Sequence, residues 1–225
     1  MRRDERNSWW RLGAPLARLF ERALFRVSVE GAEHVPSSGA AVLAFNHVSV
    51  LDGPCVAIET SLRRRREIRF LVAAEVFRRP FFGWVLRSFE QIPIRRGEGD
   101  RGALDTAIAT VRQGAVAALA PEGHVNADPS RGLQRIRSGV ARVSMPTGAP
   151  VVPVGIWGPQ ERWPKTGPSF ARIWHRPALA IAYGPPVFPS GDGALQEDID
   201  TFRERVGTAI VAQVARARAM AEAGR

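Results

Sequence analysis

The pattern of apolar and polar positions is helical at the start of the chain. In residues 8–25 apolar side chains recur every three or four positions with arginines between them, which predicts an amphipathic helix. Trp9 and Trp10 stand beside arginines at its start, a composition that suits a helix lying in the headgroup layer of a bilayer. A helix packed on its own domain shows the same periodicity, so both interpretations stand.

Beyond this helix, short apolar runs alternate with helical stretches. Strands are expected at residues 25–31, 40–46, 68–73, 91–95, 115–120, 151–157, 170–174 and 179–184, and helices at residues 52–62, 80–89, 101–113, 133–147 and 194–221. Such alternation predicts a single α/β domain, with a mostly parallel or mixed central sheet flanked by helices. We therefore expect an N-terminal membrane-interface helix in residues 1–27 and the α/β domain in residues 28–225.

Composition adds a charge and a compartment to this picture. The 225 residues suffice for one domain with a substantial core, and 32 basic against 22 acidic residues give a net charge of +10. All the basic residues except Lys165 are arginine, which favours partners with phosphate or carboxylate groups. A lone Cys55, the lack of metal-ligand spacing and the lack of an apolar run of about 18 residues predict a cytoplasmic protein without metal, membrane span or leader.

The first candidate for chemistry is the pair His47 and Asp52, just after the predicted strand 40–46. Ligands in α/β folds bind at the carboxyl ends of strands. The two side chains meet only if His47 lies on the loop and Asp52 in the first helical turn, a start that Pro54 supports. A carboxylate on one imidazole nitrogen would leave the other as a general base. Alternatively, Asp52 only caps the helix, in a capping-box pattern with Ser49.

Two further strand ends carry polar groups. The strand 91–95 runs into Arg95 and Arg96 and then into glycines before a helix, which favours phosphate binding or else is a solvated turn. Pro121, Glu122 and Gly123 end the strand 115–120, where Glu122 either accepts hydrogen bonds from a polyol or is a turn residue. The arginine run 63–66 is typical of a solvated face, with membrane contact as the alternative.

Four sequence segments, taken together and in order, resemble a known family. NHVSVLD, EQIPIRR, PEG and APVVPVGI resemble the four sequence blocks of the glycerolipid acyltransferases, and most closely those of the 1-acylglycerol-3-phosphate acyltransferase branch. The resemblance covers residues 40–160. It implies that His47, paired with Asp52, deprotonates a glycerol hydroxyl, which then attacks an acyl thioester. It also implies a substrate-binding set formed by Asn46, Arg96, Glu122 and Gly123.

The same resemblance implies the partners. The co-substrate is acyl-CoA or an acylated acyl carrier protein, the acceptor is a lysophospholipid, and no further cofactor is expected. An N-terminal helical segment places such enzymes on the membrane, in agreement with the amphipathic pattern of residues 8–25. We therefore expect a peripheral protein on the cytoplasmic face of the cell membrane, in contact with anionic lipid.

The departures from the family pattern leave the acceptor open. Glu90 stands where the second block usually has glycine, and His124 and Val125 stand where the third continues with Thr-Arg. Either Arg131 or Arg137 replaces the missing basic contact, and we include Arg137 among the substrate-binding residues, or the acceptor is another lysolipid or a glycolipid. A third hypothesis is a basic membrane- or nucleic-acid-binding protein without catalysis. No nucleic-acid module is recognisable, so nucleic acid is not expected.

Overall fold

A mixed sheet organises the chain. The computed structural model describes residues 6–95, 99–169 and 175–224. Within them the strands are β1 (Arg26–Glu30), β2 (Ala41–Phe45), β3 (Ile68–Ala73), β4 (Ile92–Ile94), β5 (Val116–Leu119), β6 (Val151–Trp157) and β7 (Ala178–Tyr183). The helices are α1 (Ser8–Leu24), α2 (Asp52–Arg64), α3 (Ala74–Phe77), α4 (Pro80–Ser88), α5 (Arg101–Arg112), α6 (Gly139–Ser144) and α7 (Gln196–Ala223). Short 3₁₀ turns cover Ala32–His34, Pro129–Arg131, Met145–Thr147 and Pro159–Glu161.

The strand order brings several carboxyl ends to one edge. The sheet runs β1-β7-β6-β2-β5-β3-β4, and the pairs among β6, β2, β5, β3 and β4 are all parallel. Only β7 is antiparallel to β6, and β1 follows β7 in parallel. The expected single α/β domain with a mixed sheet is therefore confirmed. Its central strand β2 is buried at every position, which explains its continuous apolar run.

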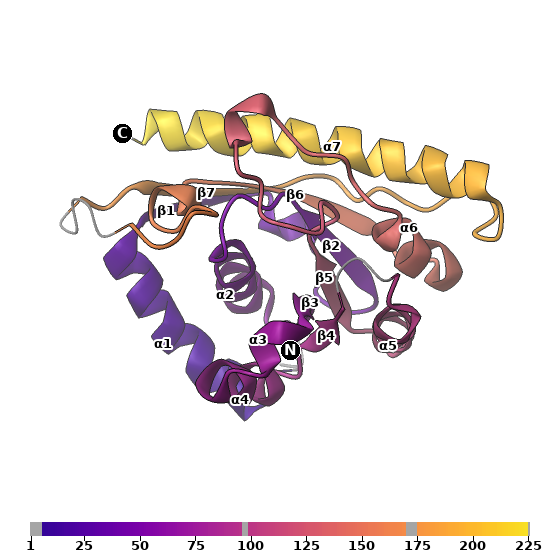
Figure 1. Cartoon of the computed structure of the whole chain (residues 1–225), viewed down its shortest axis with the longest axis horizontal. Coiled ribbons are helices and arrows are strands. Elements are labelled where there is room, and N and C mark those ends of the chain that lie inside the picture. Colours follow the sequence, from indigo (N-terminus) through magenta and orange to yellow (C-terminus); the bar gives the residue numbers. More distant parts are fainter. Residues whose placement is uncertain (1–5, 96–98, 170–174, 225) are drawn as a thin grey trace.

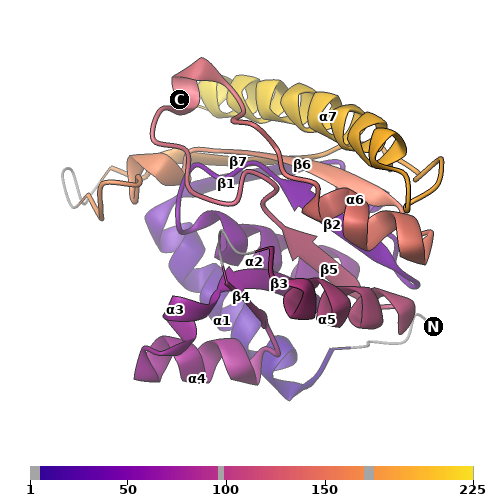
Figure 2. The same cartoon turned by 45° about the vertical axis from the view of Figure 1, so that its right-hand side comes forward.

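Helices cover both faces of the sheet. On one face α1 and α2 pack over a core that includes Leu43 and Phe45 of β2. On the other, α5, α6 and α7 pack over a core that includes Val42 and Ala44. Figure 1 shows α7 lying across the sheet on the side opposite to α1 and α4, and Figure 2 shows α6 beside α7. The alternation of β2 side chains between the two cores follows from the two-residue period of a strand.

The described elements differ from the expected ones at two places. The predicted helix 133–147 is wrong over its first half, because α6 spans only Gly139–Ser144. Before α6, the backbone N–H groups of Gln134 and Arg137 bond to Glu122 and Pro121 rather than to a helical turn. The four-residue helix α3 is too short to produce a period and was not expected. The predicted strand 170–174 lies outside the described residues.

The arginine run 63–66 is divided between solvent and the interior. Arg63 and Arg65 are exposed, as on the expected solvated face, whereas Arg64 and Arg66 hold loops together. Arg66 is only 1% exposed, and its guanidinium donates to three loop carbonyls, those of Pro36, Gly39 and Gly114. Arg64 likewise donates to the Val35 carbonyl. A buried guanidinium is tolerated when its donors are matched in this way.

Helix α1 packs on the core with its less apolar face. Trp10, Ala14 and Glu21 are buried. Its exposed large apolar side chains are Trp9, Leu12, Leu16, Leu19, Phe20 and Leu24. The expected amphipathic helix is therefore present, and its large apolar face points away from the protein. The expected boundary at residue 27 lies one residue inside β1, which begins at Arg26.

An acidic pair is buried where α1 meets α2. The carboxyl of Glu21 lies beside Glu59, which is fully buried and pairs with two guanidinium groups, Arg18 Nε at 3.2 Å and Arg63 Nε at 2.8 Å. Burial and the neighbouring Glu59 raise the pKa of Glu21 to about 8, against the weaker opposing effects of a hydrogen bond with Cys55 and of the Arg18 charge. Glu21 therefore stays protonated at neutral pH, which lets two carboxyl groups share one site.

This arrangement predicts a pH-dependent stability. The folded state holds the Glu21 proton up to about pH 8, whereas the unfolded chain releases it near its ordinary pKa of 4.5, so this residue lowers the free energy of unfolding as pH rises between these values. We expect Glu21→Gln to raise the free energy of unfolding at pH 8 by about 1–3 kcal/mol and to change it little at pH 5. Urea unfolding at both values measures this difference, and equal pH dependence in the two proteins would contradict it. As a control, Glu59→Gln should destabilise at both pH values because two guanidinium groups lose their partner.

Candidate active site

The loop after β2 brings His47 and Asp52 together. His47 Nδ1 lies 3.0 Å from Asp52 Oδ2. The same oxygen accepts the backbone N–H groups of Val48 at 2.7 Å and Ser49 at 2.8 Å. Asp52 is the first residue of α2, so the expected placement, with His47 on the loop and Asp52 in the first turn, is confirmed.

The local sequence makes this turn. Ser49 Oγ accepts the N–H of Leu51 and donates to the Trp163 carbonyl. Leu51 is the N-cap of α2 and makes no side-chain cap bond, while the Asp52 carboxylate reaches back to the Ser49 N–H. This is the reciprocal half of the capping-box pattern. Asp52 thus combines both alternatives left by the sequence, because it orders the helix start and also contacts His47.

The electrostatics define which nitrogen is available. Burial raises the pKa of Asp52, while the bonds from His47, Ser49 and Val48 oppose that effect. Its other oxygen, Oδ1, is buried and accepts no bond from a described residue. The His47 side chain is 14% exposed, and its Nε2 makes no hydrogen bond within the described part of the chain. A proton on Nδ1, directed at Asp52, leaves the Nε2 lone pair free to accept a proton.

Asn46, predicted to bind substrate, makes structural contacts. Its side chain is buried, its Nδ2 donates to the Ile156 carbonyl at 3.0 Å, and its Oδ1 accepts the Ile156 N–H at 2.7 Å. Asn46 follows β2, and Ile156 lies in the neighbouring β6. The amide therefore continues the β2–β6 ladder and fixes the strand end from which His47 projects.

Glu122 and Gly123 lie next to this loop, as expected from adjacent strand ends. Glu122 is 1% exposed, and its Oε1 accepts the His47 N–H at 2.6 Å. Burial raises the pKa of Glu122, and the backbone bonds from His47 and Gln134 oppose it. Gly123 has φ 77°, and a Cβ there would lie 2.7 Å from Arg137 Nε. A glycine is needed both for this backbone conformation and for the close approach of Arg137.

Arg137 lies against the turn that contacts the His47 backbone, whereas the arginine pair at residues 95 and 96 is only partly described. Arg137 is exposed and lies against Gly123. Arg96 lies outside the described residues. Its neighbour Arg95 is exposed, and Asp100 accepts the Arg95 N–H and caps α5 through the Ala103 N–H. The helix N-terminus expected to favour phosphate is thus already bonded to a carboxylate, whose pKa these backbone bonds lower.

The position that usually holds glycine in the second block is conformationally special. Glu90 has φ 53°, a left-handed conformation that costs a non-glycine residue free energy. Its carboxylate lies 2.5 Å from Arg69 Nη2, which also pairs with Glu67. Where the family has glycine, this chain therefore has a glutamate that keeps the left-handed backbone and forms an ion pair with Arg69 of β3.

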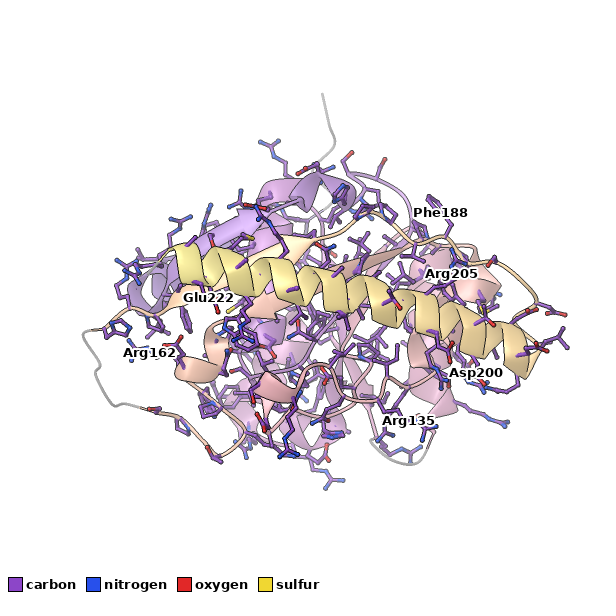
Figure 3. The ribbon with its side chains drawn as sticks, turned by 90° about the horizontal axis from the view of Figure 1, so that it is seen from above. Arg135, Arg162, Phe188, Asp200, Arg205 and Glu222 are labelled. Atoms are coloured by element: carbon purple, nitrogen blue, oxygen red, sulfur yellow. The ribbon has the colours of Figure 1, made fainter. Side chains whose placement is uncertain are left out.

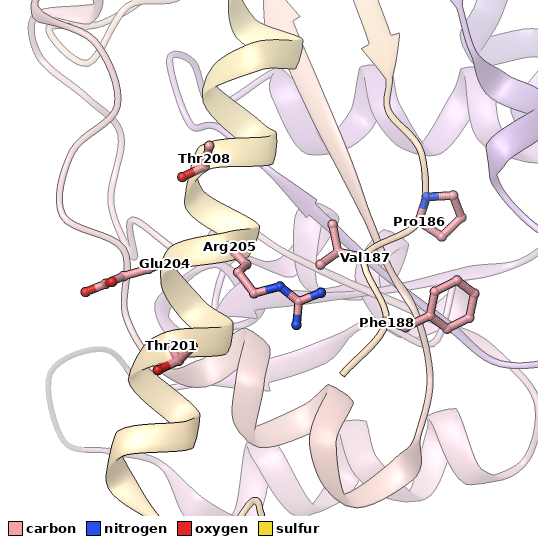
Figure 4. Close-up of a pocket in the computed structure, with 7 residues that line it drawn as sticks. All are labelled: Pro186, Val187, Phe188, Thr201, Glu204, Arg205 and Thr208. Carbon is pink, nitrogen blue, oxygen red and sulfur yellow. The ribbon is translucent and has the colours of Figure 1, made fainter. Parts of the chain in front are cut away.

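Other chemistry is sparse in the described ranges. No three His, Cys, Asp or Glu side chains among these residues are arranged to hold a metal ion. A shallow hollow lies between the 186–188 segment and α7 (Figure 4), and Figure 3 shows Phe188 and Arg205 on this side of the molecule. Val187 pairs with Val151 at the start of β6, so this hollow lies at the end of the sheet opposite to His47.

No described helix is both long enough and apolar enough to cross a bilayer.

A family model named Acyltransferase matches residues 26–157, which contain the His47 loop, the Glu122 turn and β6. The chain belongs to the acyltransferase family. The resemblance drawn from the four blocks is confirmed at this level, and the dyad lies within the matched region.

Individual proteins extend the comparison. Uncharacterized proteins of Mycobacterium bovis and Mycobacterium tuberculosis are 32% identical over 185 residues, 78% of this chain and 47% of theirs. The chain therefore spans about half the length of the curated relatives it matches. The crystal structure of the 1-acyl-sn-glycerophosphate acyltransferase PlsC from Thermotoga maritima is similar in fold, with a TM-score of 0.69, 23% identity and coverage of 92% of this chain and 79% of that one.

Sequence reasoning missed two residues around the site. Asn126 donates its backbone N–H to the His47 carbonyl at 2.6 Å, and Gln134 donates its N–H to Glu122 Oε2 at 3.0 Å. Neither lies in a recognisable motif. The only sequence signal for Asn126 is its place in the polar turn after β5, which pairs with β2.

Proposed function

We propose that this acyltransferase-family protein transfers a fatty acyl group from an acyl thioester to the free hydroxyl of 1-acylglycerol-3-phosphate. The observation that supports it most strongly is the His47–Asp52 contact at the carboxyl edge of parallel strands. The acceptor class is supported by the resemblance of the four blocks and by the fold shared with PlsC, a 1-acyl-sn-glycerophosphate acyltransferase.

The proposed mechanism uses the free imidazole nitrogen. His47 Nε2 takes the proton of the acceptor hydroxyl as its oxygen attacks the thioester carbonyl. The tetrahedral intermediate collapses with cleavage of the C–S bond, and the leaving thiolate takes the proton back from the imidazolium. The Asp52 carboxylate holds Nδ1–H and stabilises the transient positive charge on the ring. The carrier of the thioester is coenzyme A or acyl carrier protein.

Arg137 is our proposed ligand for the acceptor phosphate. It is exposed, lies against Gly123 and belongs to a segment bonded to the Glu122 turn. An exposed guanidinium forms charge-assisted bonds with phosphate oxygens. It would thereby replace the arginine that the family has two residues after Gly123, a position that the buried Val125 holds here. The absence of this arginine from the third block also favours a second candidate function, in which the same reaction acylates another lysolipid or a glycolipid.

We also propose that the protein lies peripherally on the cytoplasmic face of the cell membrane, in contact with anionic lipid. The exposed apolar face of α1 continues onto α4, where Phe81, Phe82 and Trp84 are exposed, and Trp9 meets Trp84 edge-on with ring centroids 5.2 Å apart. We name these side chains of α1 and α4 the apolar patch. Exposed arginines of the same two segments accompany the patch: Arg11, Arg22, Arg78, Arg79 and Arg87. Such a combination suits an anionic bilayer surface.

The central prediction concerns His47. We expect His47→Ala to lower acceptor-dependent thiol release from palmitoyl-CoA by about 10²- to 10⁴-fold, because a general base contributes that much. Purified protein in detergent is assayed with lysophosphatidic acid, other lysolipids and glycolipids, with acyl carrier protein donors tested in parallel. His175→Ala, at an exposed histidine, is the matched control and should stay at the wild-type rate. Retained turnover in His47→Ala would reject the mechanism, and release without an acceptor would indicate a thioesterase.

A second prediction concerns the acceptor phosphate. We expect Arg137→Gln to raise the KM for lysophosphatidic acid by about tenfold or more with a small change in kcat, because it removes a charge-assisted contact. Arg112→Gln makes the same charge change at the exposed last residue of α5 and should leave KM unchanged. An unchanged KM in Arg137→Gln would remove this assignment. A clear preference for an unphosphorylated lipid in the acceptor panel would favour the second candidate.

A third prediction concerns the apolar patch. Leu12→Ser/Leu16→Ser on α1 and Phe81→Ser/Trp84→Ser on α4 should each weaken binding to phosphatidylglycerol vesicles at least tenfold, since each removes two large apolar side chains from the interface. Co-sedimentation with vesicles measures this. The matched control is Phe188→Ser/Val211→Ser, on the α7 side of the sheet, which should bind as the wild type does. Undiminished binding of both patch variants would reject this membrane face.

A further inference from the structure

The backbone of His47 is held from both sides by one turn. Its N–H donates to Glu122 Oε1 at 2.6 Å, and its carbonyl accepts the Asn126 N–H at 2.6 Å. The turn follows β5, whose Leu119 is paired with Ala44 of β2. Parallel pairing therefore brings the turn and the loop to the same edge, where two short bonds fix the peptide groups on each side of the histidine.

The same turn also holds the segment that carries Arg137. Glu122 Oε2 accepts the Gln134 N–H at 3.0 Å. Asn126 uses its side chain for three further bonds. Its Nδ2 donates to the Gly132 carbonyl at 2.8 Å, and its Oδ1 accepts Gln134 Nε2–H at 2.9 Å and the Asp128 N–H at 3.0 Å. The N–H of Arg137 itself donates to the Pro121 carbonyl at 2.8 Å.

These contacts leave Glu122 little capacity to bind an acceptor. The side chain is 1% exposed, and each of its oxygens already accepts a backbone N–H from a different segment. A carboxylate buried in this way is costly unless such donors compensate it. Its contacts lead to the backbone of the proposed base on one side and to the Arg137 segment on the other.

We propose that Glu122 and Asn126, together the 122/126 clamp, set the position of His47 relative to Arg137. This proposal rests on the proposed function. In it, Glu122 is a positioning residue that acts through His47, and the Asn126 side chain positions the Arg137 segment. The clamp thereby fixes the distance between the base and the phosphate ligand, and so determines which hydroxyl of a phosphorylated acceptor reaches His47 Nε2. Small displacements of such groups cost large factors in rate.

Two variants separate the halves of the clamp. Glu122→Gln keeps the shape of the side chain but turns one acceptor oxygen into an NH₂ group that faces a backbone N–H. Asn126→Ala keeps the backbone bond to the His47 carbonyl and removes the side-chain bonds with Gly132, Gln134 and Asp128. We expect Glu122→Gln to lower kcat about 10- to 100-fold and to change the pH profile of kcat/KM. We expect Asn126→Ala mainly to raise the acceptor KM.

A double-mutant cycle distinguishes positioning from direct acceptor binding. If Glu122 acts through His47, His47→Ala/Glu122→Gln is no slower than His47→Ala alone, because the group it positions is gone. A Glu122 that contacts the acceptor directly would instead add its loss to that of His47→Ala and raise KM. Additive losses would therefore overturn the proposal. Cooperative thermal unfolding of each variant checks that it remains folded.

Amide hydrogen exchange tests the clamp independently of activity. We expect exchange at the His47 N–H, followed by NMR, to become at least tenfold faster in Glu122→Gln or Glu122→Ala than in the wild type, and to stay unchanged in Asn126→Ala. Unchanged exchange at His47 in both Glu122 variants would overturn the proposal. If the wild type transfers no acyl group to any acceptor while His47 exchange responds as expected, the proposed function fails and the clamp remains.

Discussion

The contact between the Asp52 carboxylate and three N–H groups is the constraint on which the site depends. One oxygen accepts the imidazole Nδ1–H of His47 and the backbone N–H groups of Val48 and Ser49. It therefore orders the turn, begins helix α2 and orients the ring with a single group. Because Asp52 is fully buried, losing this carboxylate would leave several donors without a partner in a place that water does not reach.

A second buried carboxylate works on the other side of the same histidine. Glu122 holds the His47 N–H, and burial raises the pKa of both acids. Two carboxyl groups so near each other are compatible with a buried site because backbone donors surround them. The parallel order of β2, β5 and β6 makes this possible, since it brings the loop after β2, the turn after β5 and the Asn46–Ile156 bonds to one edge.

Helix α2 connects this site with the apolar patch. Its first residue is Asp52, and its Glu59 faces the α1 helix through Arg18 and Glu21. The face of α1 that packs on α2 therefore contains two polar side chains, Arg18 and the buried, protonated Glu21, while the larger apolar face remains outside. This distribution is the reverse of that of an ordinary surface helix, whose apolar side covers the core. It gives the helix one side suited to protein and one suited to lipid.

Most elements and the place of the His47–Asp52 pair follow from the local sequence. Periodicity predicted α1, α7 and most strands, and the step from strand to helix placed His47 on a loop and Asp52 in the first turn, because these features depend on neighbouring residues. The groups that those side chains meet, in contrast, come from segments far away in the sequence. Residues 133–137 form no helix, and the N–H groups of Gln134 and Arg137 bond instead to Glu122 and Pro121. Arg66 is buried because three distant carbonyls converge on it. Long-range partners of this kind leave no periodic trace, since they depend on how the strands are ordered in the sheet.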